Sequence, residues 1–424
     1  MSVYDDLVWR ELVVQMSDPV EIPKLLSSEG QAIYGGFDPS GTSLHIGHLV
    51  PLLAMRRFQL AGHKPIVLIG GATGLIGDPS GRKTERTLNT KEVVAGYVEG
   101  IKTQVERIVD PTGSSSLRIV NNLDWFEPVT AIEFLRDIGK HFSINTMIAK
   151  DSVQSRLNRD DVGISYTEFS YMLLQAFDFF HIFKEYGCRL QVGATEQWGN
   201  MTAGIELVRR KLSERVHCLT FPLILNASGE KFGKSEGGAV WLDAELTSSY
   251  AFYQYFVNTD DRDVINYLKY FTMLGQEEIG ELEHRSQAYP EQREAQRRLA
   301  YEVTAIVHGS SEADKVVAAS QALFGNYDLA DIDLKTLLSA VESAPTVMYG
   351  CVDALPSLMT LAVEAELVSS KSEARRQIES GGIYVNNNRI SDIDFKPKVS
   401  DLLHGKLILL RKGKRNYSVV RIGG

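Results

Sequence analysis

A strand–helix–strand pattern between residues 31 and 69 constrains the fold of this 424-residue chain more than any other feature. An apolar stretch at 31–37 is followed by a turn rich in Asp, Pro, Ser and Gly, a helical pattern at 49–60 and a second apolar stretch at 66–69. A connection of this length suits two parallel strands, because a crossover helix returns the chain along the sheet. The pattern therefore predicts an α/β fold.

Two histidines, in the sequence His45-Ile-Gly-His48, fall where the turn meets this helix. The N-terminus of a helix offers free N–H groups to a phosphate, and two imidazoles one turn apart face the same side. Both rings could therefore reach one polyphosphate, although the spacing alone also fits an ordinary loop-to-helix junction. No third ligand of suitable spacing stands nearby, which argues against a metal site.

A second motif, Lys231-Phe-Gly-Lys-Ser235, occurs far downstream in a polar loop. Two lysines and a hydroxyl around a glycine suit the stabilisation of polyphosphate charge in a transition state, although alone they also fit a solvated basic loop. The two motifs in this order on an α/β chain resemble the two signature motifs of class I aminoacyl-tRNA synthetases. The resemblance implies nucleotide chemistry at the edge of a parallel sheet.

The rest of the first half alternates strands with helices. Further strands are predicted at 117–120, 189–193 and 217–225, with a leading helix at 3–15 and helices at 90–109 and up to about 212. This alternation predicts a Rossmann-like, doubly wound and mostly parallel sheet with a helical insertion at about 125–188.

A glycine-rich stretch at 70–80 ends near Asp78, where the backbone could pass close to a ligand beside a carboxylate. The stretch lacks the Gly-x-x-x-x-Gly-Lys-Ser/Thr pattern and is not a P-loop. Within the helical insertion, Tyr171, Gln175 and Asp178 fall on one face of a helical pattern. That face is either a solvated stripe or the wall of a pocket.

Four domains are expected from these patterns: a catalytic domain at 1–230, a signature-loop and α-helical domain at 231–342, a linker at 343–356 and a small α+β domain at 357–424. From residue 371 onward there are 12 Lys and Arg against 5 Asp and Glu, whereas the preceding residues carry a net charge of −16. This asymmetry indicates that the C-terminal domain meets a polyanion, with an acidic neighbouring domain as the alternative partner. The domain resembles αL-type RNA-binding modules.

Composition excludes several classes of protein. The chain is 44% hydrophobic and 23% charged, which is typical of soluble globular proteins. It has no apolar run of transmembrane length and no signal-peptide pattern, so a cytoplasmic protein without a membrane partner is expected. Its three cysteines are scattered and indicate neither a disulfide framework nor a zinc site.

The whole chain is similar to bacterial tyrosyl-tRNA synthetases. The similarity is carried by the two signature motifs together with Tyr34-Gly-Gly-Phe-Asp-Pro, the 70–80 stretch, the Tyr171 helix and Gln197-Trp-Gly-Asn. It implies activation of L-tyrosine by ATP to tyrosyl-adenylate and pyrophosphate, then transfer of tyrosyl to the 3′-terminal adenosine of tRNA(Tyr). It also implies Mg²⁺ on the ATP phosphates, no protein-bound metal, and a homodimer.

The resemblance assigns roles to individual residues. Tyr34 and Asp178 would hold the phenolic hydroxyl of tyrosine, and its α-ammonium and carboxyl groups would meet Asp78, Tyr171, Gln175 and Gln197. The nucleotide would be lined by Gly36, Asp38, Gly47, His48, Gly193, Glu196 and Lys234. The catalytic residues acting on the phosphates would be Ser40, His45, His48, Lys231, Lys234 and Ser235. Binding of tRNA would use Lys371, Arg375, Arg376, Arg411, Lys412, Lys414 and Arg415.

Two residues depart from the family pattern, which more often has Asp at Glu196 and Gly at Ala194. The longer Glu196 side chain can still accept a hydrogen bond from a ribose hydroxyl if its backbone lies further away. Three alternatives share part of this pattern: a tryptophanyl-type synthetase, a small nucleotidyltransferase without a tRNA partner, and a non-catalytic RNA-binding paralogue. Against the last, His45 and Lys231 are retained.

Overall fold

The computed structural model describes residues 2–80, 88–150, 153–154, 157, 163–235, 238–323, 328–342, 344–413 and 416–423, with the backbone alone at 234–235. The chain forms two compact units. Unit 1 comprises Met1–Thr247 and Asn258–Val307, and unit 2 comprises Ser248–Val257 and His308–Gly424.

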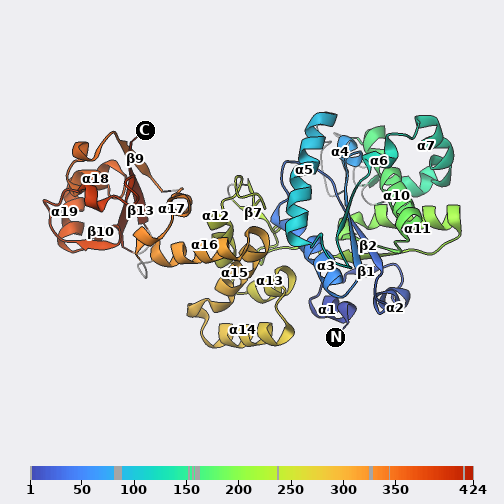
Figure 1. Ribbon diagram of the computed structural model, residues 1–424, viewed down its shortest axis with the longest axis horizontal. Coiled ribbons are helices and arrows are strands. Elements are labelled where there is room, and N and C mark those ends of the chain that lie inside the picture. The colour runs from blue at the N-terminus through green and yellow to red at the C-terminus, as the bar shows by residue number, and fades with distance from the viewer. Residues whose placement is uncertain are drawn as a thin grey trace. The chain divides into compact units, whose positions relative to one another are not determined.

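A six-stranded sheet forms the centre of unit 1 (Figure 1), in the order β1-β6-β5-β2-β3-β4. Its strands are β1 Gln15–Met16, β2 Ala32–Phe37, β3 Lys64–Ile69, β4 Arg118–Asn121, β5 Leu190–Ala194 and β6 His217–Phe221. Only the β1–β6 pair is antiparallel. The chain leaves β2 outward through β3 and β4, then returns to the other side of β2 with β5. The boundary between β2 and β5 is therefore a topological switch point, where α/β proteins bind ligands.

Helices cover both faces of this sheet. Figure 1 shows α3 (Leu49–Leu60) and α5 (Lys91–Ile108) on one face, and α10 (Tyr166–Tyr186) and α11 (Trp198–Leu212) on the other. Helix α10 begins where the Ser165 hydroxyl accepts a hydrogen bond from the Glu168 N–H at 3.2 Å, which satisfies an otherwise unpaired donor of the first turn. Its apolar side packs with β2, β3 and α11 in one buried cluster that includes Tyr34 and Phe179.

Further helices complete unit 1. Between β4 and β5 the described residues form helices, as expected for the insertion. These elements are α1 Val3–Trp9, α2 Glu21–Leu26, α4 Thr73–Ile76, α6 Leu123–Phe126, α7 Ala131–Asp137, α8 Ile144–Ile148, α13 Val264–Phe271, α14 Gln276–Ala288 and α15 Glu294–His308, with the two-stranded hairpin β7 Lys234–Ser235 and β8 Gly238–Ala239.

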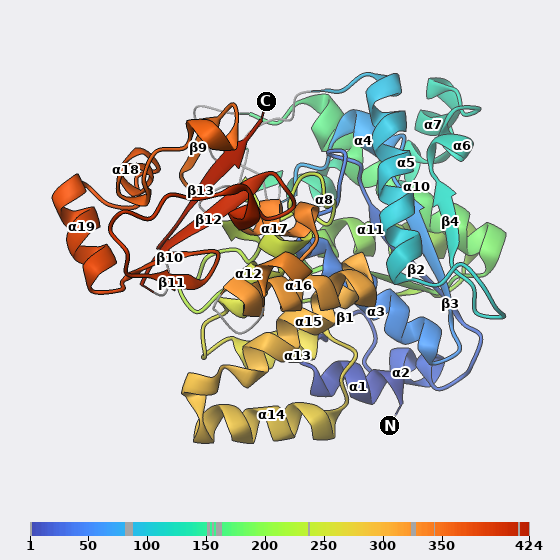
Figure 2. The same cartoon turned by 60° about the vertical axis from the view of Figure 1, so that its left-hand side comes forward.

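Unit 2 is built on a five-stranded sheet in the order β11-β10-β12-β13-β9 (Figure 2). Its elements are α12 Ser249–Val257, α16 Ser310–Leu323, α17 Leu334–Ala340, β9 Thr346–Tyr349, α18 Leu358–Glu364, α19 Lys371–Glu379, β10 Ile383–Val385, β11 Asn388–Ile390, β12 Leu407–Lys412 and β13 Asn416–Ile422. Alternate residues of β12 face opposite ways: Ile408 and Leu410 pack with α18 and α19, whereas Leu407 and Leu409 pack with α16 and α17. Both faces of this sheet are covered.

The predicted α/β class and its central strands and helices are confirmed, with three local differences. The leading helix, expected at 3–15, ends at Trp9, because Glu11 adopts a positive φ of 59° and the chain then pairs through β1 with β6. The expected linker at 343–356 contains β9, which pairs in parallel with β13. The last strand of the first sheet ends at Phe221 rather than 225.

The two units are not divided at the expected boundary of 342. Helices α16 and α17 belong to unit 2, because their apolar residues cover one face of its sheet. Among the described residues, none of the helices is both long and apolar enough to cross a bilayer.

Candidate active site

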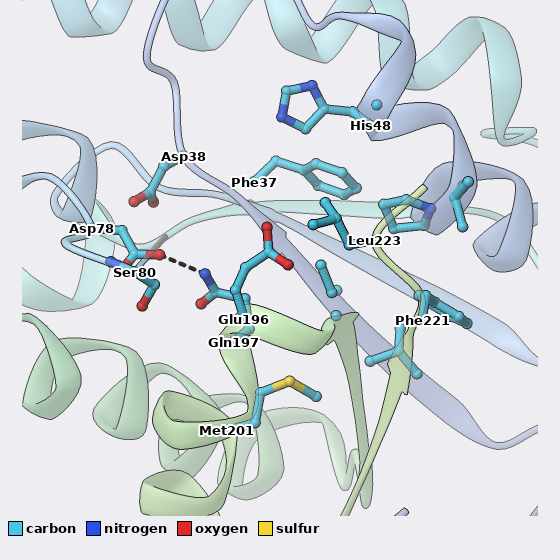
Figure 3. A pocket seen from close by; sticks show the side chains of 18 of the residues that line it. Phe37, Asp38, His48, Asp78, Ser80, Glu196, Gln197, Met201, Phe221 and Leu223 are labelled. Carbon is cyan, nitrogen blue, oxygen red and sulfur yellow. Dashed lines mark hydrogen bonds between the residues drawn. The ribbon is translucent and has the colours of Figure 1, made fainter. Parts of the chain in front are cut away.

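A cavity of about 710 Å³ opens at the carboxyl ends of β2 and β5. Figure 3 shows Asp38 and Asp78 on one side of it, and Phe221 and Leu223 on the other. Fifteen of the residues singled out from the sequence line this one cavity: Tyr34, Gly36, Asp38, Ser40, His45, Gly47, His48, Asp78, Tyr171, Gln175, Asp178, Gly193, Glu196, Gln197 and Lys231. The switch point thus gathers residues that are far apart in the sequence.

One end of the cavity is closed by Tyr34 and Asp178, which are 1% exposed each. The Asp178 carboxyl group accepts hydrogen bonds from the Trp125 indole N–H at 2.9 Å and the Asn122 amide at 3.1 Å. Burial raises the pKa of Asp178 well above its usual value, and these two donors oppose that rise. Burial also raises the pKa of Tyr34, with the nearby Asp178 adding to the effect, so Tyr34 keeps its proton.

A chain of buried hydrogen bonds runs from this end towards Asp38. Asn122 is fully buried, and its amide also donates to the Thr73 hydroxyl at 3.0 Å. Thr73 in turn donates to Asp38 at 2.6 Å, and the Tyr171 hydroxyl donates to the other oxygen of Asp38 at 2.6 Å. Asp38 is thus fixed by two hydroxyl groups.

The middle of the cavity holds a second carboxylate. The Gln197 amide donates to Asp78 at 2.5 Å, as drawn in Figure 3, and the backbone N–H of Ser80 donates to the other Asp78 oxygen at 2.9 Å. The Asn200 amide donates to the carbonyl oxygen of Gln197 at 3.2 Å and fixes its orientation. A ligand with a cationic group and a carboxyl group would find complementary partners here.

The two histidines lie against each other at the opposite end, with ring centroids 3.9 Å apart. The backbone N–H of Gly47 donates to Nδ1 of His45, and the backbone N–H of His45 donates to Nδ1 of His48, both at 3.1 Å. Each Nδ1 is therefore an acceptor without a proton, which leaves the proton of a neutral ring on Nε2. Both imidazoles can offer an Nε2–H donor to a ligand.

Burial keeps both rings neutral. It lowers the pKa of His45, and it lowers that of His48 to about 3 with a further contribution from His45. At neutral pH the pair therefore acts by hydrogen bonding rather than as fixed positive charge. Among the side chains that the structure describes, Lys231 brings positive charge to this end, where its exposed side chain lines the cavity.

The loop that carries Lys231 is joined to the histidine segment by backbone pairing. The Ile46 N–H donates to the Val240 carbonyl at 3.0 Å, and the Leu242 N–H donates to the Leu44 carbonyl at 2.8 Å. Gly233, at a φ of +94°, packs so closely that a Cβ there would lie 3.0 Å from Ile46. The two signature motifs therefore form one connected wall.

The same loop is anchored from behind by an aromatic cluster. Phe232 is 8% exposed and packs against Phe271 and Tyr267 of α13, with centroids 4.8 Å and 4.7 Å away. The side chains of Lys234 and Ser235 lie outside the described residues, so their predicted roles stay predictions.

The predicted tRNA-binding residues lie in unit 2. Lys371, Arg375 and Arg376 are exposed on α19. Arg411 instead is 9% exposed, stacks on Tyr384 at 3.9 Å and donates to Asn387, which removes it from the exposed basic surface. Lys412 pairs with Glu373 at 3.1 Å, and Lys414 and Arg415 lie outside the described residues.

Sequence reasoning did not single out Thr73, Asn122 or Trp125, which orient Asp38 and Asp178. Asn122 lies directly after β4, and Thr73 begins α4 a short turn after β3 ends at Ile69. The polar Asn121-Asn122 pair at the end of an apolar strand was the available signal. Trp125 carried none, because a tryptophan in an apolar helix usually indicates core.

A parallel sheet whose switch point joins a His-x-Gly-His loop to a Lys-Phe-Gly-Lys-Ser hairpin defines a class I aminoacyl-tRNA synthetase. A family model described as "tRNA synthetases class I (W and Y)" matches residues 27–325, and one described as "Tyrosine--tRNA ligase SYY-like C-terminal domain" matches residues 339–420. The tyrosine–tRNA ligase of Nocardia farcinica is 51% identical over 427 residues, which covers 99% of this chain and 98% of the relative. The chain belongs to the tyrosine–tRNA ligase family.

Other relatives agree with this assignment. The tyrosine–tRNA ligase of Geobacillus stearothermophilus is 48% identical, covering 99% of this chain and 100% of the relative. Among solved structures, a C-terminally truncated mitochondrial tyrosyl-tRNA synthetase of Aspergillus nidulans is 31% identical, with a TM-score of 0.69 over 76% of this chain and 94% of that one. The resemblance to this family stated from the motifs is confirmed.

Proposed function

We propose that the cavity binds tyrosine at its Asp178 end and ATP towards the two histidines, as the substrate sites of a tyrosine–tRNA ligase. In this family the carboxylate of tyrosine attacks the α-phosphate of ATP, pyrophosphate leaves, and the tyrosyl group passes to the 3′-terminal adenosine of tRNA(Tyr). The protein needs no covalent nucleophile for these steps, because positioning and charge stabilisation suffice.

The buried Asp178 is the observation that carries the choice of amino acid. Its two donors, Asn122 and Trp125, leave the carboxyl group able to accept a third hydrogen bond from inside the cavity. A phenolic hydroxyl supplies that donor beside Tyr34, whereas phenylalanine would leave the polar group unsatisfied. Strong rejection of phenylalanine by a tyrosyl enzyme is a known case of this principle.

The remaining contacts are proposed from the resemblance to the family. The α-ammonium group of tyrosine would meet Asp78, Tyr171 and Gln175, and its carboxyl group would meet Gln197. The nucleotide would lie along Gly36, Asp38, Gly47 and His48, with its ribose near Gly193 and Glu196. The leaving pyrophosphate would be stabilised by Ser40, the Nε2–H groups of His45 and His48, Lys231, Lys234 and Ser235.

We propose that Mg²⁺ enters with the phosphates of ATP. Among the described residues, His, Cys, Asp and Glu form no cluster of three that could hold a metal ion, so the ATP oxygens would supply its ligands together with water. The metal would neutralise charge on the leaving pyrophosphate.

We also infer that the protein works in the cytoplasm, where ATP and tRNA meet.

We propose that the protein is a homodimer through the insertion helices. Large apolar side chains stand exposed on α7, α8 and the start of α10: Ile132 at 72%, Leu135 at 51%, Ile144 at 57% and Tyr166 at 72%. Large exposed apolar side chains on the helices of one insertion are typical of an interface between protomers. Ile132→Asp should produce monomers in sedimentation equilibrium, whereas Leu60→Asp, at a 63% exposed site on α3, should leave the dimer intact. Monomeric unaltered protein would overturn the proposal.

The test of the activation step is tyrosine-dependent exchange of labelled pyrophosphate into ATP. Tyrosine, tryptophan and phenylalanine would be offered separately in the presence of Mg²⁺. Exchange with tyrosine alone is expected. Exchange with tryptophan instead would overturn the assigned amino acid, and no exchange from folded protein that still binds tRNA would indicate a non-catalytic paralogue.

A further inference from the structure

Behind the histidine segment, a buried glutamine of α5 joins three parts of the chain. Gln104 is 8% exposed, and its carbonyl oxygen accepts a hydrogen bond from the Leu44 backbone N–H at 2.9 Å. Its amide donates to the Ser43 hydroxyl at 3.0 Å. One side chain thus holds the two residues that directly precede His45.

Ser43 also contacts residues 242–243, the segment that follows the Lys231 loop. Ser43 is 5% exposed, and its hydroxyl donates to the Leu44 carbonyl at 2.7 Å and accepts from the backbone N–H of Asp243 at 3.2 Å. The Leu44 carbonyl also accepts from the Leu242 N–H at 2.8 Å. Residues 43–44, which precede His45, and residues 242–243, which follow the Lys231 loop, are therefore held together through the buried Gln104 amide and the buried Ser43 hydroxyl.

The geometry of α5 is fitted to this junction. Gly100 lies one turn before Gln104, and a Cβ there would lie only 2.7 Å from the Thr42 carbonyl oxygen. The absence of a side chain lets the loop approach the helix backbone. Since both polar groups of Gln104 are then used and buried, the position of the loop relative to α5 is closely defined.

We infer that Gln104 is a positioning residue for the activation step. Through Ser43 it fixes the positions of two segments together: the one that carries His45 and His48, and residues 242–243, which follow the Lys231 loop. Neither residue lines the cavity, so neither contacts a substrate. This inference rests on the proposed role of both loops at the ATP phosphates. Loss of the junction should slow phosphate chemistry and leave tyrosine binding unchanged, because the tyrosine end is built from β2, α6 and α10.

The test compares Gln104→Met with Gln59→Met. Gln59 is an equally buried glutamine of α3, 7% exposed, whose amide donates to the Asp110 and Ser115 carbonyls at 2.6 and 2.8 Å, away from the cavity. Both variants lose buried hydrogen bonds at nearly constant side-chain volume. Gln104→Met should lower kcat for tyrosine-dependent pyrophosphate exchange at least tenfold, with the Kd for tyrosine within twofold of the unaltered protein. Gln59→Met should keep both values within twofold despite a comparable fall in Tm.

Ser43→Ala serves as the second variant and carries the same test should Gln104→Met not fold. It should reduce kcat in the same way, and the double variant should be no slower than the slower single variant, because both act through one junction. Equal exchange rates for Gln104→Met and Gln59→Met would overturn the inference, as would a weakening of tyrosine binding in proportion to the loss of kcat. Failure of the proposed function would differ, because the unaltered protein would then show no exchange.

Discussion

Asp178 combines deep burial with two N–H donors, and the choice of amino acid depends on what else it accepts. In Asp178→Asn the new amide would have to turn an N–H group towards a donor, either Asn122, Trp125 or the substrate hydroxyl. We expect the KM for tyrosine in pyrophosphate exchange to rise about 10- to 100-fold, the effect of leaving a buried polar group unsatisfied.

The same variant should lose discrimination against phenylalanine, whose KM should change much less than that of tyrosine. Asp137→Asn, on the exposed end of α7, provides the control and should leave both values unchanged. An equal rise for the two amino acids would show that Asp178 supports the fold of the cavity and does not read the hydroxyl.

The shifted pKa of His48 should make the free energy of unfolding depend on pH. Its pKa falls from 6.5 to about 3 on folding, so the unfolded chain takes up a proton first as the pH decreases. The stabilisation is complete above pH 6.5 and is lost progressively below it. Between pH 6.5 and 5 we expect a loss of about 1 kcal/mol, which is less than the pKa change alone would give because the ring keeps some contact with solvent.

Urea unfolding of the unaltered protein and of His48→Gln across this range would measure that loss. The difference between the two free energies of unfolding should narrow as the pH decreases from 6.5 to 5. A constant difference would contradict a neutral, buried His48.

At the scale of elements, the lysine loop depends on α13. Phe232→Ala would remove the ring packed on Phe271 and Tyr267, and a buried Phe-to-Ala change typically costs about 3 to 5 kcal/mol. We expect kcat for pyrophosphate exchange to fall at least tenfold, because the loop loses its anchor. Phe232→Leu should retain most of the activity, since it refills part of the space. Equal activity of the two variants would show that the ring does not hold the loop.

The elements themselves were largely predictable. Helix α3 begins and ends where its pattern predicted, at Leu49 and Leu60, because a long apolar periodicity bounded by polar turns is a strong local signal. Strand β1, with two residues, and β9, within a stretch containing prolines and a glycine, were missed. Both exist through pairing with distant strands, and no local pattern reports a distant partner.

The residues of the site were predictable from the sequence to a similar extent. The motifs identified the residues that line the cavity, since these carry unusual chemistry at strand ends. The residues that orient them, such as Asn122 and Gln104, look like ordinary polar positions in the sequence. The position of Asn122 at a strand end is a weak signal, and the roles of both residues depend on burial and on partners 56 and 60 residues away.

At the scale of the whole molecule, the two units should separate two activities. Arg376 is exposed on α19 in unit 2, whereas the cavity lies in unit 1. Arg376→Ala should weaken tRNA charging and reduce the slope of log(kcat/KM) against log salt by about 1, the effect of losing one phosphate contact. Pyrophosphate exchange should be unaffected. Lys24→Ala, an exposed cation of unit 1, is the control and should leave the charging slope unchanged. An unchanged slope for Arg376→Ala would remove this residue from the RNA-binding surface.

The division of the chain between the two units has a further consequence. Because Ser248–Val257 belongs to unit 2 while residues on both sides of it belong to unit 1, the backbone passes between the units three times. Helix α12 packs with α16 and α17, so a protease cut after residue 307 would leave the C-terminal fragment held without a covalent bond. By the same reasoning, a gene fusion with one junction could never transplant unit 2 complete; it would leave α12 behind in the donor.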